Sequence, residues 1–473
     1  MVFRRRLHAL VPALVTLACS NRPSQDSGDE GTGMTTGAST GQSPTEASGS
    51  TSVEPPPVVC EPCDAPWKLD GMLDAGPGTD LSPYTCLVEV SGDLSIAGDL
   101  SPVQLAPLCH LQVVGGWMSI RDNTLLTDLS IFARLEKVTV LNLYGLPALS
   151  EVAGLTSLRK VQELNIGDTG ATALGAFAPD FAGITNLGLF SNPALSDLSV
   201  MASWGFAGGA FGPLISLRDN PAITDLSDLE GLLAAAPDDL SFELRDMSGL
   251  TSLAGLGGIS RGRYDLSGLP QITDLQPLAK VKTLGGLSLS DMPLTSLDGL
   301  GSLQSADLGL YGLPQLESLH GLESFQTGDL TMIDLPKLSS LAPLGAFTQS
   351  EAIVMYDLPL VTSLAGLDNL QSVYSLMIGD CVNEGRSGMT GLTDLQGLGS
   401  LTSVSEFMVT NGTKLKSLAG VDQLTSVDYR LAIINNPALP QAAFDAFVAQ
   451  VSEPEKTCFG DWGVCECIYF NPG

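Results

Sequence analysis

The segment Leu287–Leu300 reads LSLSDMPLTSLDGL, and closely related phrases occur at Leu308–Leu322 and Leu330–Leu344. Each phrase starts with two apolar residues one residue apart, passes through a proline and continues into a Leu-x-x-Leu run. A phrase repeated at this period is typical of a solenoid, in which each repeat forms one coil that packs on its neighbours. The sequence therefore predicts an all-β-dominated solenoid.

The apolar-x-apolar pair occurs fifteen times and places the coils within residues 94–440, with 21 to 31 residues between successive pairs. Each pair predicts a short strand with one face buried. Nine prolines support this register, because each lies four residues after the second apolar residue of its pair and ends the strand. The pairs begin at Leu94, Met118, Leu141, Leu164, Leu187, Ile215, Phe242, Tyr264, Leu287, Leu308, Leu330, Ile353, Leu376, Phe407 and Leu431.

These phrases resemble leucine-rich repeats. Stretches such as Ile272–Leu278 and Leu338–Leu344 are similar to the repeats of internalin-type bacterial surface proteins. The Asn-Pro-Ala phrases at Asn192, Asn220 and Asn436 resemble receptor L-domains, which also occur in bacterial lipoproteins. The resemblance implies a right-handed β-solenoid of about 15 coils that binds a protein or glycan at a cell surface.

The N-terminus has the pattern of an export signal. Residues 1–18 combine three arginines with an apolar run too short to span a membrane, and Cys19 follows. This arrangement resembles the bacterial lipoprotein cleavage site, which implies that Cys19 is lipidated; an ordinary secretory signal is the alternative. Residues 19–57 form a Ser/Thr/Gly/Pro tether with too few apolar residues to fold. We therefore expect an exported protein, lipid-anchored in the bacterial outer membrane or at the cell surface.

The chain is strongly acidic, with 52 Asp and Glu against 22 Lys and Arg and a net charge of −30. Such a charge disfavours nucleic acid and anionic membrane surfaces as partners. We therefore expect no nucleic-acid partner, and contact with the membrane only through the lipid anchor. A well-solvated secreted surface explains the same charge without any ligand.

Eight cysteines remain after Cys19, and they cluster at the two ends of the repeats. Disulfides are the natural staple for small terminal caps in an oxidising compartment. A zinc site would need further well-spaced ligands, and a thioredoxin-like pair would need a βαβ context that is absent. We expect disulfides among Cys60, Cys63, Cys86, Cys109, Cys381, Cys458, Cys465 and Cys467, with Cys381 joining the C-terminal group.

The two caps follow from these clusters. Residues 58–93 form an N-terminal cap, and residues 441–473 form a C-terminal cap that contains a helix. Phe444, Phe447 and other apolar residues recur at helical spacing after Pro440, which suits the first turn.

Catalytic machinery is not visible. No nucleophile elbow, zincin motif, phosphate loop or dinucleotide fingerprint occurs, and His110 and His320 fall at coil corners. We therefore expect no enzyme activity, no cofactor and no metal. A site hidden in the insertions Met201–Pro213 or Cys381–Gly391 is the alternative.

Two positions follow each apolar pair, and the second is often aspartate. One hypothesis is that Asp starts a turn by bonding its own backbone. The other is that a row of carboxylates binds cations. These residues are Asp122, Asp168, Asp219, Asp246, Asp291, Asp334, Asp357 and Asp380.

The first of the two positions points outward on a strand of period two. Seven of the fifteen are Arg, Tyr or Phe, the types enriched at binding hot spots, and strand preference explains Tyr but not Arg. We predict a recognition row of ligand-binding residues that is dispensable for stability, because neighbouring leucines fill the core. A featureless spacer and recognition through the Trp204–Gly212 insertion are the alternatives. The row contains Arg121, Tyr144, Phe190, Arg218, Arg245, Tyr311 and Tyr356.

Overall fold

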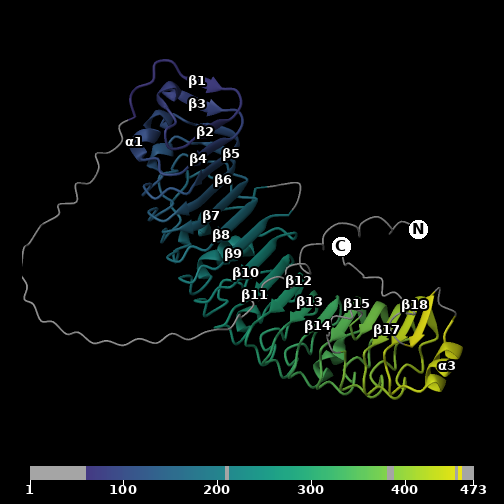
Figure 1. The fold of residues 1–473 in the computed structure, drawn as a ribbon. Helices are drawn as coiled ribbons and strands as arrows, with labels where there is room; N and C mark the ends of the chain where they lie inside the picture. The colour runs from purple at the N-terminus through teal and green to yellow at the C-terminus, as the bar shows by residue number, and fades with distance from the viewer. Residues whose placement is uncertain (1–59, 208–211, 381–387, 453–455, 461–473) are drawn as a thin grey trace, which may run out of the picture. The chain divides into compact units, whose positions relative to one another are not determined.

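Nineteen strands form one parallel sheet in the computed structural model, which describes residues 60–207, 212–380, 388–452 and 456–460. From β4 onward each strand pairs with the next along the chain, and Figure 1 shows this stack. The strands are β1 (Trp67–Leu69), β2 (Leu73–Ala75), β3 (Leu87–Val90), β4 (Leu94–Ala97), β5 (Val113–Arg121), β6 (Lys137–Leu146), β7 (Glu163–Thr169), β8 (Asn186–Phe190), β9 (Leu214–Arg218), β10 (Ser241–Arg245), β11 (Arg263–Ser267), β12 (Thr283–Ser290), β13 (Ser305–Tyr311), β14 (Leu330–Ile333), β15 (Gln349–Tyr356), β16 (Ser372–Ile378), β17 (Ser403–Thr410), β18 (Ser426–Ile434) and β19 (Lys456–Gly460).

The predicted register is confirmed at all fourteen steps, from Leu94 opposite Met118 to Phe407 opposite Leu431. The ladder is longer than predicted by one strand at each end, because β2 pairs with β4 and β19 pairs with β18. The predicted N-terminal cap therefore contains a strand of the main ladder. The all-β solenoid predicted from the repeats is confirmed.

Helices are short and lie between strands or at the C-terminal end. The α-helices are α1 (Pro102–Leu105), α2 (Glu230–Ala234) and α3 (Gln441–Gln450). Single turns of 3₁₀ helix lie at Ser82–Tyr84, Ala106–Leu108, Ser130–Phe132, Ser199–Ser203, Ser227–Leu229, Gln276–Leu278 and Ala342–Ala346. In the described part of the chain no helix has the length and apolar character that crossing a bilayer requires.

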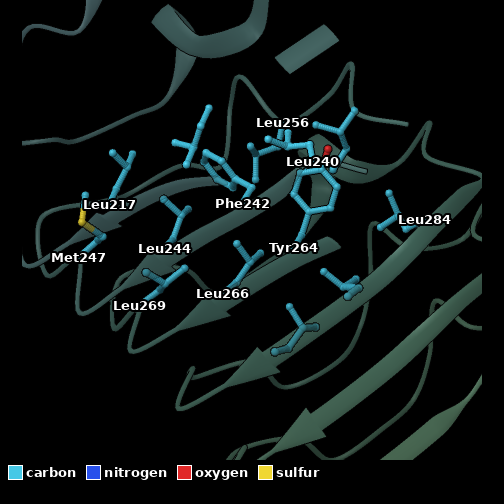
Figure 2. Packing of buried hydrophobic residues seen from close by; sticks show 14 of the residues in the cluster. Leu217, Leu240, Phe242, Leu244, Met247, Leu256, Tyr264, Leu266, Leu269 and Leu284 are labelled. Atoms are coloured by element: carbon cyan, nitrogen blue, oxygen red, sulfur yellow. The ribbon is translucent and has the colours of Figure 1, made fainter. Parts of the chain in front are cut away.

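The core is a stack of inward side chains supplied by each coil. In Figure 2, Leu217, Phe242 and Leu266 come from consecutive strands and point to the same side of the sheet. Tyr264 occupies one of these inward positions, and its burial raises the pKa of the phenol to about 12. Removing such a buried leucine would cost about 2–5 kcal/mol, because the stack cannot close the cavity.

Helix α3 packs against the last coils. Phe444 and Phe447 are buried, and the Phe447 ring lies 5.6 Å from that of Phe407 on β17. The predicted capping helix is thus present, although Pro440 is its N-cap rather than part of its first turn.

Disulfides close the N-terminal end. Cys60 is bonded to Cys109 and Cys63 to Cys86, so Cys60 and Cys63 are not a redox pair with each other. His110 is buried beside the first bond, where its Nδ1 lies 2.7 Å from Arg134 and its Nε2 lies 2.7 Å from the Glu61 carbonyl. These contacts differ from the expectation that His110 is an incidental corner residue.

The C-terminal cysteines are described only in part. Cys458 on β19 is disulfide-bonded. Cys381, Cys465 and Cys467 lie outside the described residues, as does Cys19. The pairing of Cys381 with the C-terminal group stays a prediction.

Candidate binding face

The position that follows each strand has a left-handed backbone. Among the aspartates, φ is between 50° and 55° at Asp122, Asp168, Asp219, Asp246, Asp291, Asp334 and Asp357. Other coils place Gly, Asn or Ser there with positive φ, and these are types that tolerate this conformation. The left-handed conformation accounts for aspartate at this position, while the bond from its side chain to its own backbone and cation binding along the row both stay hypotheses. Asp380 differs, because Gly379 before it has the positive φ.

Asp291 shows that carboxylates of this row act on one another. Burial raises the pKa of Asp291, and the charges of Asp246 and Asp334 raise it further. Glycines separate these three aspartates, at Gly268 and Gly312 on the intervening coils. The glycines reduce the density of charge along the row while keeping the same backbone conformation.

The seven predicted recognition residues lie in one row of the sheet. Arg121 is directly opposite Tyr144, Phe190 is opposite Arg218, and Arg218 is opposite Arg245. Tyr311 and Tyr356 continue the row with Ile333 between them. Arg121 is exposed and the other six are half-buried, so all have some surface available to a partner.

Three aromatic rings of this row lie back over glycines on the sheet. A Cβ placed on Gly188 would meet Phe190 Cζ at 2.3 Å, and one on Gly309 would meet Tyr311 Cε2 at 2.4 Å. On Gly167 it would meet Tyr144 Cδ1 at 2.8 Å. Glycine in a strand interior marks such a close approach, and here it lets each ring rest on the backbone.

An ion-pair network fixes the two central arginines. Arg218 donates to Glu243 at 2.5 Å and to the Ser216 hydroxyl at 3.0 Å, and its guanidinium lies 5.9 Å from the Phe190 ring centroid. Arg245 donates to Asp265 at 2.6 Å. Burial raises the pKa of Asp265, while Arg245 opposes this shift. This contact argues against the prediction that the row is dispensable for stability at Arg245, because losing Arg245 would leave a largely buried carboxylate without its partner.

Neither a family model nor a curated protein matches the chain. Among solved structures, it is similar to an internalin (InlF) from Listeria monocytogenes, with 16% identity and a TM-score of 0.37 over 80% of this chain and 87% of that one. An LRR protein from Leptospira interrogans gives 15% identity and a TM-score of 0.31, over 76% of this chain and 94% of that one. The TLR13–ssRNA13 complex gives 12% identity and a TM-score of 0.24, over 83% of both chains. The fold assignment rests on the ladder itself, with one parallel strand per repeat and leucines inward. The chain is an all-β solenoid of leucine-rich coils.

Trp117 is a further candidate that the sequence analysis did not single out. It lies on β5 before Arg121, and its side chain is 61% exposed. It precedes the inward Met118 directly, so strand alternation places it on the outward face of the solenoid. Strand alternation around Met118 is the sequence signal that indicates the outward position of Trp117.

The accessible part of the row has a limit near the C-terminal end of the solenoid. On β17 and β18 the outward residues Met408, Thr410, Ala432 and Ile434 are buried. The open recognition row therefore extends from β5 to β15.

The alternative binding element, the insertion after β8, packs inward where it is described. Trp204 is buried, and its ring lies 5.3 Å from Phe177 and 5.6 Å from Phe181. Residues 208–211 of this insertion, and 381–387 of the other, lie outside the described residues. Trp204 therefore packs against the preceding coil, between β7 and β8, and is not available to a partner.

Proposed function

We propose that this leucine-rich-repeat protein is a cell-envelope-anchored recognition protein that binds a protein partner through its outward row. Phe190, Arg218 and Arg245 carry the proposal, because they stand side by side on β8, β9 and β10. Aromatic residues and arginine dominate binding energy at protein interfaces, where they act as rigid anchors. A glycan partner at the same row is the other outcome that a binding test can give.

The row is preorganised in a way that favours binding. Ion pairs hold both arginines, and glycines seat the rings, so little side-chain freedom is lost when a partner docks. The acids Glu243 and Asp265 balance the two arginines, so this centre differs from the strongly acidic remainder of the chain. A partner that fits it needs apolar surface and hydrogen-bonding groups more than a strong charge.

Anchoring rests on the N-terminal sequence alone. Cys19 follows an export-type segment and precedes a polar tether, an arrangement that suits a lipoprotein displayed away from the membrane. A structural spacer in the envelope is the second candidate. The small residues Gly167, Ser267 and Ser290 in the row favour the spacer function, because they offer a partner little contact surface.

The test compares matched baits. Full-length protein, Phe190→Ala and Arg218→Ala are used to capture partners from envelope extract, with Arg159→Ala as the control because Arg159 forms an exposed ion pair outside the row. We expect a partner that binds wild type and the control but binds the two row variants at least about 30-fold more weakly, equivalent to about 2 kcal/mol. If no partner distinguishes the row variants from the control, the spacer function is the better account.

A further inference from the structure

A second surface feature lies away from the centre of the row, on β16, β17 and β18. Val373 is opposite Val404 and Ser375 is opposite Glu406, so Tyr374 and Ser405 face each other outside the ladder pairing. On β18 one extra residue is inserted, because Val404 pairs with Val427 but Glu406 pairs with Arg430. A bulge of this kind bends its strand and re-aims the side chains beside it.

A pocket of about 360 Å³ lies at this bend. The buried side chains of Val373 and Val404 line it. Serines from neighbouring strands, Ser372, Ser403 and Ser405 among them, line it as well. The volume falls at the lower end of the range for small-molecule sites, roughly 300–1,000 Å³.

The polar groups of the pocket have unused hydrogen-bonding capacity. Within the described ranges, the hydroxyls of Ser372, Ser403 and Ser405 have no side-chain partner, and each can both donate and accept. Asp428 accepts from Ser426 through Oδ1 at 2.5 Å and adds a carboxylate to the same wall. These groups match a ligand that carries several hydroxyls close together.

The aromatic side chain of the pocket is unusually open. Tyr374 is 54% exposed, although large apolar side chains at most other positions of the sheet are buried. An exposed ring beside hydroxyls offers an apolar face and a polar rim at once. The C–H face of a sugar ring has the complementary character.

The lining also restricts the charge of the ligand. It contains no Lys, Arg or His, and its one ionisable acid is Asp428 in a chain of net charge −30. An anionic ligand would enter without a compensating cation, at an electrostatic cost. We propose that this pocket binds a neutral saccharide of one or two sugar rings, stacked on Tyr374 and hydrogen-bonded to Ser403, Ser405 and Asp428.

This site is independent of the proposed protein-binding centre. Its residues come from β15 to β18, whereas Phe190, Arg218 and Arg245 lie on β8 to β10. Loss of saccharide binding would therefore leave the proposed partner recognition untouched, and the reverse also holds.

Calorimetric titration of the full-length protein tests the proposal. The probes are lactose, maltose, cellobiose and chitobiose, with sialyllactose as the anionic comparison. We expect at least one neutral probe to bind at concentrations up to about 10 mM, Tyr374→Ala to weaken it about tenfold or more, and Tyr374→Phe to retain it. Ser403→Ala combined with Ser405→Ala should also weaken it about tenfold, because two hydrogen bonds are lost.

Tyr84→Ala is the matched control, since Tyr84 is a half-buried tyrosine of the turn Ser82–Tyr84, outside both the pocket and the outward row. It should leave saccharide binding unchanged, and thermal melts of all variants exclude unfolding as the cause of a loss. The proposal is overturned if no neutral probe binds wild type, if sialyllactose binds equally well, or if Tyr374→Ala leaves binding intact.

Discussion

Arg245 on β10 donates from Nη2 to Oδ2 of Asp265 on β11 at 2.6 Å, with side chains 24% and 12% exposed. The acceptor lies on the next coil, so the bond ties two coils together at the middle of the proposed recognition row. The proposed recognition and the stability of the sheet therefore involve the same side chain at this point.

Arg245→Ala should lower the free energy of unfolding by about 2 kcal/mol, because a charged hydrogen bond is lost and Asp265 stays largely buried. Urea denaturation measures this. Arg159→Ala serves as the control, since its pair with Asp180 is 56% and 61% exposed and should contribute less than about 1 kcal/mol. Equal losses in the two variants would show that burial does not matter at Asp265.

Gly188→Ala should displace the Phe190 ring, because the added Cβ would lie 2.3 Å from Cζ. We expect unfolding to become easier by about 1 kcal/mol, and affinity for a captured partner to fall as well. Gly345→Ala is the comparison, since a Cβ there meets no atom within 4 Å. Denaturant melts that do not separate the two variants would mean that the ring does not rest on the glycine.

Asp291→Asn should stabilise the protein near neutral pH. The pKa of Asp291 is raised in the folded state, so the folded form holds its proton more tightly than the unfolded chain does. Stability is then lost as pH rises from the ordinary value of 3.8 through the folded pKa, and the advantage of Asn should vanish below that window.

Asp291→Ala separates this charge effect from the backbone effect. Alanine also removes the repulsion but tolerates the left-handed backbone poorly, so it should be about 1 kcal/mol less stable than Asp291→Asn. Unfolding curves at acidic and neutral pH measure both. If Asn and Ala are equivalent, the positive φ does not constrain this position.

Disulfide mapping of the unreduced protein should recover peptides linking Cys60 to Cys109 and Cys63 to Cys86. Thiol titration of the unfolded, unreduced protein should find almost no free thiol, because Cys381, Cys465 and Cys467 are predicted to pair in the C-terminal group with Cys458. Stoichiometric zinc together with four free thiols would contradict the disulfide prediction.

Cys19→Ser should release the protein from membranes or stall its processing, because the proposed acylation site is removed. Fractionation and N-terminal sequencing of the exported protein are the measurements. A Cys19→Ser protein that stays membrane-bound and is cut normally would rule out the lipoprotein anchor.

The sequence was sufficient for the ladder because its signal is local. A pair such as Leu287 and Leu289, with Pro293 behind it, determines where a strand lies and which face is buried. The strand β2 was missed because Leu73 and Ala75 lack the proline and the Leu-x-x-Leu run that follow the other pairs.

Interactions between coils were not predictable in the same way. Both the contact of Arg245 with Asp265 and the pocket beside Tyr374 join residues from different coils. The first depends on side-chain rotamers, and the second lies beside a bulge. Asn123 is a further case, since its buried amide donates to the carbonyls of Gly98 and Leu100 on the preceding coil. The sequence near Asn123 does not indicate where those carbonyls lie.

Coil length has no effect on strand register. Leu308 follows Leu287 by 21 residues and lies directly opposite it. Phe407 follows Leu376 by 31 residues and also lies directly opposite it. Insertions are therefore absorbed away from the outward face, and a whole coil could be duplicated or deleted while its neighbours keep their pairing. Each such event would move the flanking contact residues apart or together by one fixed step of about 4.8 Å. The distances between contact residues on the outward face can therefore change during evolution in steps of one whole coil.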